Sequence, residues 1–566
     1  MASDATAGTS GADGLHRGSR AVAAAILLSR LAGLVRERVL AQWLGTGLAA
    51  EALRAGLRIP NLLQNLLGDG VLSAAFVPSY ARLLAEGRRE EAGRLAAAVA
   101  SVLLGLTGVL ALLGVVLAGP LTRLLAPGFP PGTEKYALTV TLVRVLAPGA
   151  GLLVLASWAL GVLTAHRRFF RAYVAPVVWN AAIVAAGVAA GLRGLGEVDV
   201  ALAVAVGALV GAGLQLAVQL PAVRREAGRA AVRPRRPGSV PQVRGVLHAA
   251  RGAIAARGVV QLSAYLDLAV ASLLAAGAVA ALGYAQVLHL LPVSLFGMSV
   301  AAAALPDLAT AGRSAPAKAA DRVAASLRRT TALALPTAAA YVVVGDHLVG
   351  LVFGGGAFGA AETRQVAAVL AAYALGLVAT TRGRVLQAAL HALDDTRTPA
   401  RLATVRVVVG TLAGVGLMLV LDAWRWDAGG PVRIGTSGLA PLAERAADGS
   451  LYRLGAVGLG LGATVGAWTE TGLLRAAVGR RLPLPRGAAP WRDALLTAAT
   501  VVAVGLATRT WVPALLGDGR TTDVVVIGST GAAALAALVL TGAVELPRPL
   551  RRGARRAPAG DPPAGP

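Results

Sequence analysis

Arginines inside apolar stretches are the residues of this chain best suited to bind a charged ligand. In the segment SRLAGLVRER, Arg30 and Arg36 lie six residues apart, so a helix would separate them by about a third of a turn. Glu37, seven residues after Arg30, shares the face of Arg30. Charges inside a membrane span cost roughly 2.5 to 3.5 kcal/mol each and usually face a protein interior or a water-filled cavity. The excess of base over acid therefore predicts a site for an anion, although a purely structural Arg–Glu pair is the alternative.

Other charged residues follow in later apolar segments. Glu51, Arg54 and Arg58 precede Pro60 in the second segment, where acid and base can neutralise one another across the first pair of helices. Deeper charges are Arg257, Asp267, Arg382, Arg384 and Arg406. Asp267 has two open interpretations, as a partner of Arg257 or another arginine, or as a ligand for a coupling ion or a gate. Arg38 is expected to extend toward lipid headgroups.

The sequence offers no motif for a metal, a cofactor or an enzyme. It contains no cysteine, and its six histidines show no metal-ligand spacing. The glycine-rich stretch GLGLGATVG at 458–466 follows no predicted strand, so close packing of helices explains it better than a nucleotide fingerprint. We find no Walker loop, zinc-protease motif or GxSxG elbow. We therefore expect no cofactor, no metal and no catalytic residue.

Composition places this chemistry in a membrane. Of the 566 residues 56% are hydrophobic, and the mean hydropathy is +0.66, well above what a soluble core needs. Lipid satisfies no backbone hydrogen bonds, so spans must be helices or a closed barrel, and alternating barrel patterning is absent. An all-α polytopic membrane protein is predicted. The net charge of +25 is distributed mostly between spans, so no nucleic-acid partner is predicted.

Apolar runs broken by glycine, proline and charge predict about fourteen spans. Their approximate ranges are 21–44, 48–68, 95–119, 136–163, 173–192, 198–221, 245–275, 278–305, 326–353, 364–392, 399–421, 454–478, 491–511 and 523–544. An even number puts both termini on one side. Alternate loops are rich in arginine, as at 224–236, or nearly free of it, as at 354–362, which predicts cytoplasmic termini.

A weak internal repeat predicts the domain organisation. LTAHRRFFRAYVAP at 163–176 and AALHALDDTRTP at 388–399 both close a span with a histidine, a charged turn and a proline, and Pro60 corresponds to Pro292. Two related six-span halves followed by two further spans are expected. The segments are a polar start 1–20, a lobe 21–221, a basic linker 222–244, a lobe 245–480, two helices within 481–546 and a disordered basic tail 547–566. The outer loop 422–453 is expected to be irregular or partly helical.

The stretch Ser29–Tyr80, which includes PNLL and the FVP of AAFVP, resembles the start of the MurJ (MviN-type) lipid II flippases. LAPGF at 125–129, QLPAV from Gln219 and DDTRTP from Asp394 extend the resemblance. It implies membership of the multidrug/oligosaccharidyl-lipid/polysaccharide exporter superfamily. The family's fold has two six-helix lobes plus two helices, with a cationic central cavity that alternates in access.

The resemblance also implies roles for individual residues. Arg30, Arg36, Arg58 and Arg384 fall on basic positions of the family, and Glu37 and Glu51 keep the charge of acidic ones, with Asp69 in place of a glutamate. Gln64 and Val287 stand where the family has cavity arginines. Arg257 and Arg406 are the candidates to supply those charges, and Arg54 is a further candidate for the cationic cavity. Asp267 matches an acidic sodium ligand of some relatives, but Arg406, Gly410 and Gly414 replace polar ligands, which argues against sodium.

The function expected from charge and resemblance together is export of lipid II across the cytoplasmic membrane of a bacterium, for peptidoglycan synthesis. The expected partners are this polyprenyl-pyrophosphate glycan, membrane lipids, and cell-wall synthesis or division proteins. Three alternatives stay open: a flippase for another polyprenyl-linked glycan, a drug exporter, or a degenerate transporter that acts as a membrane scaffold.

Overall fold

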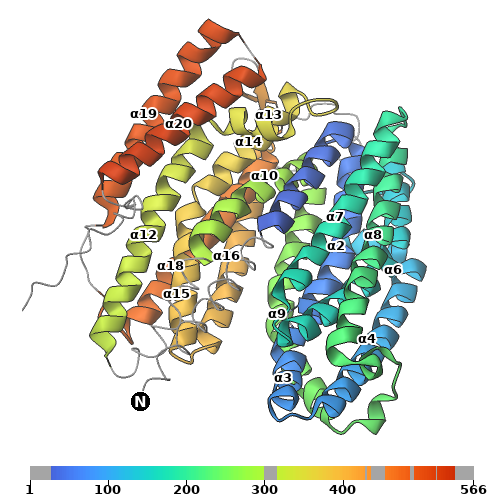
Figure 1. Cartoon of the computed structure of the whole chain (residues 1–566). Coiled ribbons are helices and arrows are strands. Elements are labelled where there is room, and N and C mark those ends of the chain that lie inside the picture. Colours follow the sequence, from blue (N-terminus) through green and yellow to red (C-terminus); the bar gives the residue numbers. More distant parts are fainter. Residues whose placement is uncertain are drawn as a thin grey trace, which may run out of the picture.

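The computed structural model describes residues 27–69, 71–298, 315–427, 430–434, 453–484, 490–517 and 519–541. The expected polar start, the basic tail and most of the outer loop lie outside these residues. The described chain is almost entirely helical and forms two groups of helices side by side (Figure 1). The all-helical membrane fold predicted from composition is confirmed.

The N-terminal group consists of a first helix over residues 27–44 and the helices that follow it up to α8. Its elements are α2 (Leu48–Leu63), the π-helical turns η1 (Gln64–Asp69) and η2 (Leu72–Phe76), α3 (Val77–Ala85), α4 (Arg89–Val116), α5 (Ala118–Leu125), α6 (Glu134–Ala165), α7 (Phe169–Leu192) and α8 (Glu197–Ala227). Two short 3-10 turns, η3 (Arg229–Val232) and η4 (Pro237–Ser239), lead to α9 (Gln242–Ser272). α9 packs against both groups, because it contacts η1 and η2 on one side and α16 on the other.

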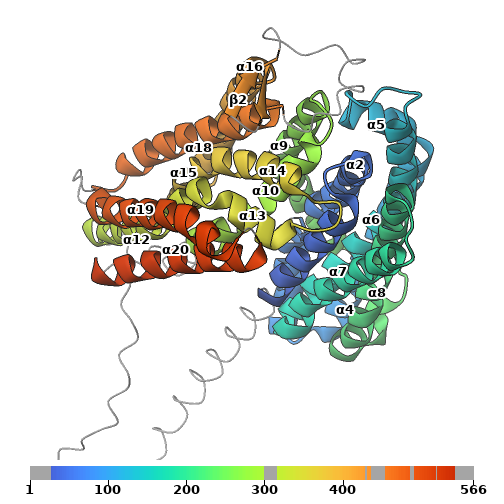
Figure 2. The same ribbon diagram turned by 90° about the horizontal axis from the view of Figure 1, so that it is seen from above.

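The C-terminal group begins with α10 and ends with α20. Its elements are α10 (Ala278–Pro292), the π-helical turn η5 (Val293–Met298), α12 (Pro316–Val343), α13 (Gly345–Phe353), α14 (Ala360–Ala374), α15 (Leu377–Ala392), α16 (Arg397–Leu421), α18 (Gly455–Gly479), α19 (Pro490–Leu516) and α20 (Arg520–Leu540). α19 and α20 lie at the edge farthest from the N-terminal group (Figure 2).

Eight described helices are long and apolar enough to cross a membrane, and ten if two bent pairs each count as one span. The pairs are α12 with α13, bent by 79°, and α14 with α15, bent by 45°. The other predicted spans, 21–44, 48–68, 245–275 and 454–478, coincide with helices that do not meet those criteria over their described residues. Sequence periodicity located these helices but not their bends.

The two turns that carry the weak sequence repeat share one backbone geometry. Arg167 and Asp394, at the turns after α6 and α15, both adopt positive φ angles, of 58° and 59°. In each turn the next residue donates its N–H to a carbonyl five residues back, Arg168 to Leu163 and Asp395 to Leu390, at 2.9 Å. Similarly, Pro60 and Pro292 each lie near the end of a helix that continues into a π-helical turn.

α16 and α18 pack closely because glycines face one another. A Cβ atom added to Gly462 would lie 2.2 Å from the Cα of Gly414, and one added to Gly458 would lie 2.5 Å from the backbone N of Met418. Such distances allow no larger side chain without a shift of the backbone. The helix-packing interpretation of GLGLGATVG is therefore confirmed.

The outer loop begins differently from the prediction. β1 (Trp424–Asp427) pairs antiparallel with β2 (Gly430–Arg433), with Trp424 opposite Arg433. The expectation of an irregular or partly helical loop is therefore wrong for these two strands, and residues 435–452 of the loop lie outside the described residues. Alternating large residues before the glycines of WDAGG are typical of a hairpin, which the sequence analysis overlooked.

Candidate functional site

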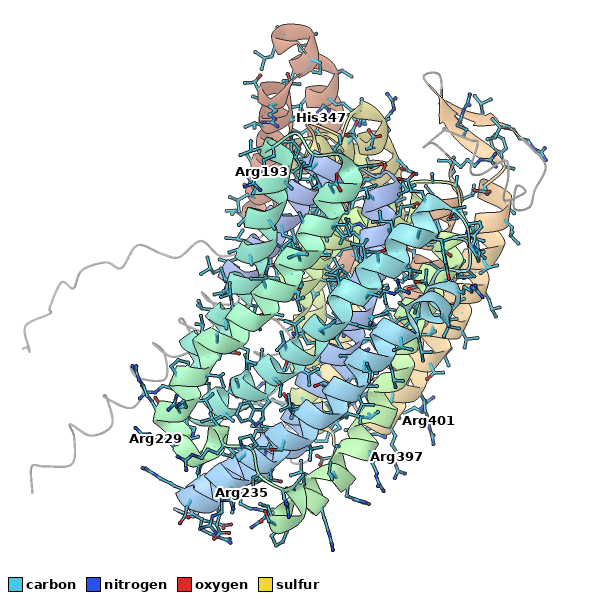
Figure 3. All side chains as sticks on the ribbon, turned by 90° about the vertical axis from the view of Figure 1, so that its right-hand side faces the viewer. Arg193, Arg229, Arg235, His347, Arg397 and Arg401 are labelled. Carbon is cyan, nitrogen blue, oxygen red and sulfur yellow. The ribbon has the colours of Figure 1, made fainter. Side chains whose placement is uncertain are left out.

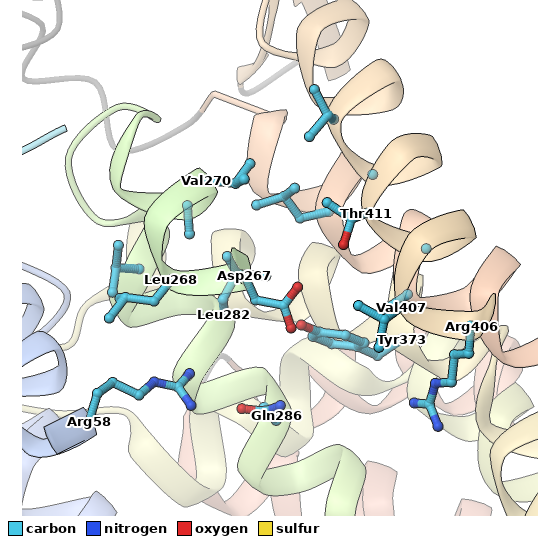
Figure 4. A pocket seen from close by; sticks show the side chains of 18 residues that line it. Arg58, Asp267, Leu268, Val270, Leu282, Gln286, Tyr373, Arg406, Val407 and Thr411 are labelled. Atoms are coloured by element: carbon cyan, nitrogen blue, oxygen red, sulfur yellow. The ribbon is translucent and has the colours of Figure 1, made fainter. Parts of the chain in front are cut away.

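A cavity lies where α2, α9, α10, α14 and α16 meet, between the two groups of helices. Its polar lining consists of Arg58 from α2, Asp267 from α9, Gln286 from α10, Tyr373 from α14, and Arg406 and Thr411 from α16 (Figure 4). The cavity volume is about 120 Å³. Pockets that enclose whole organic ligands usually measure roughly 300 to 1,000 Å³. In this conformation the cavity is therefore large enough only for a small polar group or water.

Two arginines flank one carboxylate in this cavity. Arg58 and Arg406 approach from opposite sides, and the carboxylate of Asp267 lies between them, directed at Tyr373 (Figure 4). Asp267 forms no ion pair within the described residues, although Arg58 and Arg406 both act on it electrostatically. The lining thus has two guanidiniums and one carboxylate, which is a net positive site. All three residues were predicted from the sequence as charges inside spans, but the sequence did not predict that they line the same cavity.

Arg406 is held in place by a carboxylate that the sequence analysis missed. Its Nη1 donates to Oε2 of Glu470 at 3.2 Å, and Nε2 of Gln387 donates to Oε1 of the same carboxylate at 2.9 Å. Glu470 lies on α18 and is only 3% exposed. The signal was present in the sequence, since a single acid inside the apolar stretch GAWTETGLL has the same insertion cost as the arginines that we selected.

The other arginines of the tenth predicted span have different environments. Arg382 is buried, donates to Oγ1 of Thr331 at 2.7 Å and stacks over Trp491. Arg384 is exposed, interacts electrostatically with Arg406 and Glu470, and does not line the cavity. Its position places a further positive charge beside the Arg406–Glu470 pair.

Arg36, Glu37 and Arg54 form a second, more deeply buried cluster. Glu37 accepts hydrogen bonds from Nη2 of Arg36 at 2.7 Å and from Nη2 of Arg54 at 2.9 Å. Arg36 also donates to Oδ1 of Asn180 at 3.0 Å, and the guanidinium of Arg54 stacks 4.0 Å from the ring centre of Tyr284. Because both cations share one carboxylate, the cluster retains positive charge, but Arg54 is occupied with structural contacts.

Arg30, Gln64 and Val287 are not among the residues that line the cavity. Arg30 is exposed and makes no hydrogen bond or ion pair within the described residues. Gln64 begins η1, and Val287 lies one position beyond Gln286, off the cavity-facing side of α10. The side chains of Asp69 and Arg257 lie outside the described residues.

Toward one end, contacts from α2 and from the turn before it to α10 join the two groups. Oε1 of Glu51 accepts the backbone N–H of Val279 at 2.9 Å, and Glu51 also pairs with Nζ of Lys135. The hydroxyl of Tyr284 donates to the carbonyl of Gly45 at 3.0 Å. These contacts close this end of the interface between the groups.

The same closure continues around the loop after α13. The N–H of Ala357 donates to the carbonyl of Gln42 at 2.9 Å. Arg38, expected to extend toward headgroups, instead donates to the carbonyls of Val352 and Gly354. A buried aromatic cluster of Tyr284, Phe353 and Phe358 packs behind these contacts.

A family model and individual relatives identify the same family. Residues 40–424 match the family model described as "Lipid II flippase MurJ". The chain is 33% identical over 407 residues to the "Probable lipid II flippase MurJ" of Rhizobium meliloti, covering 71% of this chain and 75% of that protein. It is 32% identical over 402 residues to the "Lipid II flippase MurJ" of Burkholderia cenocepacia, covering 70% and 77%.

Solved structures show the same fold. A lipid II flippase MurJ in an inward closed conformation superposes with a TM-score of 0.71 at 18% identity, covering 92% of this chain and 98% of that chain. An inward-facing multidrug resistance MATE family transporter of the MOP superfamily superposes with a TM-score of 0.61 at 16% identity, covering 80% and 95%.

Proposed function

Because the chain belongs to the MurJ family of lipid II flippases, we propose that Arg58 and Arg406 bind the pyrophosphate of lipid II in the cavity between the two groups of helices. The chain is a multi-pass membrane transporter and not an enzyme. The proposal rests on one observation: each group contributes one guanidinium to the same cavity.

The chemistry of the ligand fits this arrangement. A pyrophosphate carries several negative charges on closely spaced oxygens, and a guanidinium binds two such oxygens at once with a planar pair of N–H donors. In the ligand-free state Asp267 attracts both arginines without an ion pair among the described residues, and Glu470 is the ion-pair partner of Arg406. A bound phosphate would pair with both arginines directly, and its repulsion from Asp267 favours a shift of that carboxylate away from the binding position.

Placing the two arginines on different groups links binding to movement. A ligand shifts a conformational equilibrium only if it interacts differently with the two states. A phosphate held by Arg58 on α2 and Arg406 on α16 draws the two groups together around it. Alternating access then requires that the contacts of Glu51 and Tyr284 break and open their end of the interface, while the opposite end closes.

The family positions outside the cavity have supporting roles in this proposal. Arg36 with Glu37 and Arg54 keeps positive charge next to α2, and Arg384 adds charge beside Arg406. Arg30 is exposed in this state, and we propose that it meets the headgroup in another conformation. Arg406 replaces the charge that the family has at Gln64 or Val287.

Orientation is part of the proposal. Arg229, Arg235, Arg397 and Arg401 lie toward one end of the molecule, whereas Arg193 and His347 lie toward the other (Figure 3). Cytoplasmic loops collect Lys and Arg. We therefore assign the end with Arg229 and Arg397 to the cytoplasm, together with both termini, and the Glu51 contacts to the outer side.

Two six-helix lobes with two additional helices remain our interpretation of the domain organisation. Cell-wall synthesis or division proteins are the proposed protein partners, since lipid II is consumed on the outer side of the membrane.

Complementation of a bacterium depleted of its own lipid II flippase tests the proposal. The wild-type chain should restore growth, whereas Arg58→Ala and Arg406→Ala should not, at equal amounts of membrane protein. Arg382→Ala, which removes an arginine that does not line the cavity, is the matched control and should retain growth. Full growth with both cavity variants would contradict the proposal.

A further inference from the structure

We propose that a pocket on the lipid-facing surface of the N-terminal group, separate from the transport cavity, binds one anionic phospholipid of the cytoplasmic leaflet. One of its two acyl chains would lie between α4, α6 and α8, and its phosphate would meet Arg233 and Arg235. We call it the lateral pocket. Its apolar wall includes Ala100, Leu104, Leu155, Trp158, Leu216 and Leu220.

The lateral pocket is suited to hydrocarbon. Its volume is about 220 Å³, and Ser101 and Arg233 are the polar side chains among its lining residues. Leu104, Leu214 and Val218 are exposed on the same helices, so this surface of the group faces lipid. A pocket of this kind on a lipid-facing surface admits an acyl chain without the loss of any polar contact.

The depth of the lateral pocket matches one leaflet. Trp158 lies seven residues before the end of α6 at Ala165, and Leu220 lies seven residues before the end of α8 at Ala227. Both are therefore about 10 Å from the helix ends. The pocket is at the level of acyl chains, and the segment that follows α8 is at the level of headgroups.

That segment folds back over the mouth of the pocket. The chain leaves α8 at Gly228, whose φ is +83°, and turns into η3, where Ala231 is completely buried. The backbone N–H of Arg235 donates to Oγ of Ser101 on α4 at 2.9 Å. These contacts fix the backbone of the arginine-rich segment at the pocket, whereas a loop that only carried the positive-inside signal would need no such attachment.

The arginines of this segment have no acidic partners in the described part of the chain. Arg229, Arg233, Arg235 and Arg236 are all exposed, and Glu226, the nearest acid in sequence, pairs instead with Arg168 at 2.8 Å. Arg229 and Arg235 lie at the end of the surface formed by α4 and α8 (Figure 3). Unpaired cations at headgroup depth, above an apolar pocket, fit an anionic amphiphile better than a free anion or a zwitterionic lipid.

Native mass spectrometry of the purified full-length protein tests this. The protein is released from micelles that contain equal amounts of phosphatidylglycerol and phosphatidylcholine with identical acyl chains. One phosphatidylglycerol should be retained at least fivefold over phosphatidylcholine. Arg233→Ala with Arg235→Ala should remove that preference, and Arg193→Ala, an exposed arginine at the opposite end, should leave it unchanged.

The acyl part is tested separately. Ala100→Trp, which fills the lateral pocket, should reduce retention of phosphatidylglycerol. If Ala100→Trp lowers the yield of folded protein, Ala100→Leu takes its place and should reduce retention to a smaller extent. Equal retention of the two lipids by the wild type would overturn the proposal. So would unchanged preference in the double arginine variant, or displacement of the lipid by an equal concentration of soluble glycerol phosphate, which would indicate an anion site only.

Discussion

Arg406 and Glu470 form an ion pair at the edge of the cavity, with Nη1 of Arg406 3.2 Å from Oε2 of Glu470. The carboxylate is buried and also accepts a hydrogen bond from Gln387, so its position is fixed from a second helix. The arginine side chain is 36% exposed and reaches the cavity. The carboxylate therefore orients a guanidinium that remains free to meet a ligand.

Replacement of Glu470 should weaken transport through Arg406. Breaking a buried pair from one side typically costs about 3 to 5 kcal/mol, and the exposure of Arg406 reduces this value. Glu470→Ala should lower the lipid II affinity of the purified protein at least tenfold. Glu470→Gln, which retains an acceptor oxygen, should lower the lipid II affinity by a smaller factor. Equal affinity in wild type and Glu470→Ala, by lipid II titration, would show that Arg406 needs no orientation.

The Glu51–Val279 contact should stabilise the closed outer end. Glu51→Ala removes the acceptor for the backbone N–H of Val279 and the partner of Lys135. We expect the population of outward-open molecules to increase several-fold, because each lost buried contact of this kind is worth about 1 to 3 kcal/mol. Cysteines introduced at Gln42 and Ala357 report the change.

Crosslinking of that cysteine pair should be efficient in the otherwise wild-type protein and decrease in Glu51→Ala. Glu86→Ala, which removes an exposed acid at the opposite end, is the control and should leave crosslinking unchanged. No difference between the two variants would rule out a role of Glu51 in closure.

Gly462 should tolerate no larger side chain. A Cβ at this position lies 2.2 Å from the Cα of Gly414, so Gly462→Leu forces α16 and α18 apart. Overpacking of this kind costs about 1 to 3 kcal/mol or more. The variant should show a lower midpoint of thermal unfolding than Gly472→Leu, since nothing lies within 4 Å of a Cβ added to Gly472 on the same helix. A midpoint at or above that of Gly472→Leu would contradict the packing.

His166 should make the stability depend on pH. It follows α6, its Nε2 lies 2.9 Å from the hydroxyl of Tyr80, and burial holds the pKa of His166 below its usual 6.5. The unfolded chain then binds more protons than the folded one below about pH 6.5, so stability falls as pH decreases from 7 toward the folded pKa. In His166→Gln the loss of stability between pH 7 and pH 5 should be smaller. Identical pH profiles would exclude this histidine as a source of the dependence.

Part of the fold and of the site was predictable from the sequence, for physical reasons. Lipid permits only internally bonded backbone, so apolar runs had to be helices, and buried charge is costly enough that Arg58, Asp267 and Arg406 stood out. Hydropathy, which is averaged over a window of residues, does not predict the bends at Val344 and Gly376 or the hairpin from Trp424. These features depend on tertiary contacts or on the residues of a local turn.

The assembly of the site was not predictable. Three residues far apart in the chain line one cavity because α2, α9 and α16 meet there. A single sequence contains no signal that predicts which helices contact one another. Gln286 and Tyr373 lack charge and gave no signal. Val287 was selected because the resemblance marks that position, yet the adjacent Gln286 faces the cavity, since neighbouring residues on a helix are turned by about 100°.

The most direct test of the central claim is the amount of lipid II that reaches the outer leaflet in cells that depend on this chain. An enzyme that cleaves lipid II, added outside the cells, measures this amount. Wild type and Arg382→Ala should expose lipid II equally, Arg58→Ala and Arg406→Ala should expose less than a tenth as much, and Arg58→Lys should lie between. Wild-type exposure in both alanine variants would contradict a pyrophosphate site built from Arg58 and Arg406.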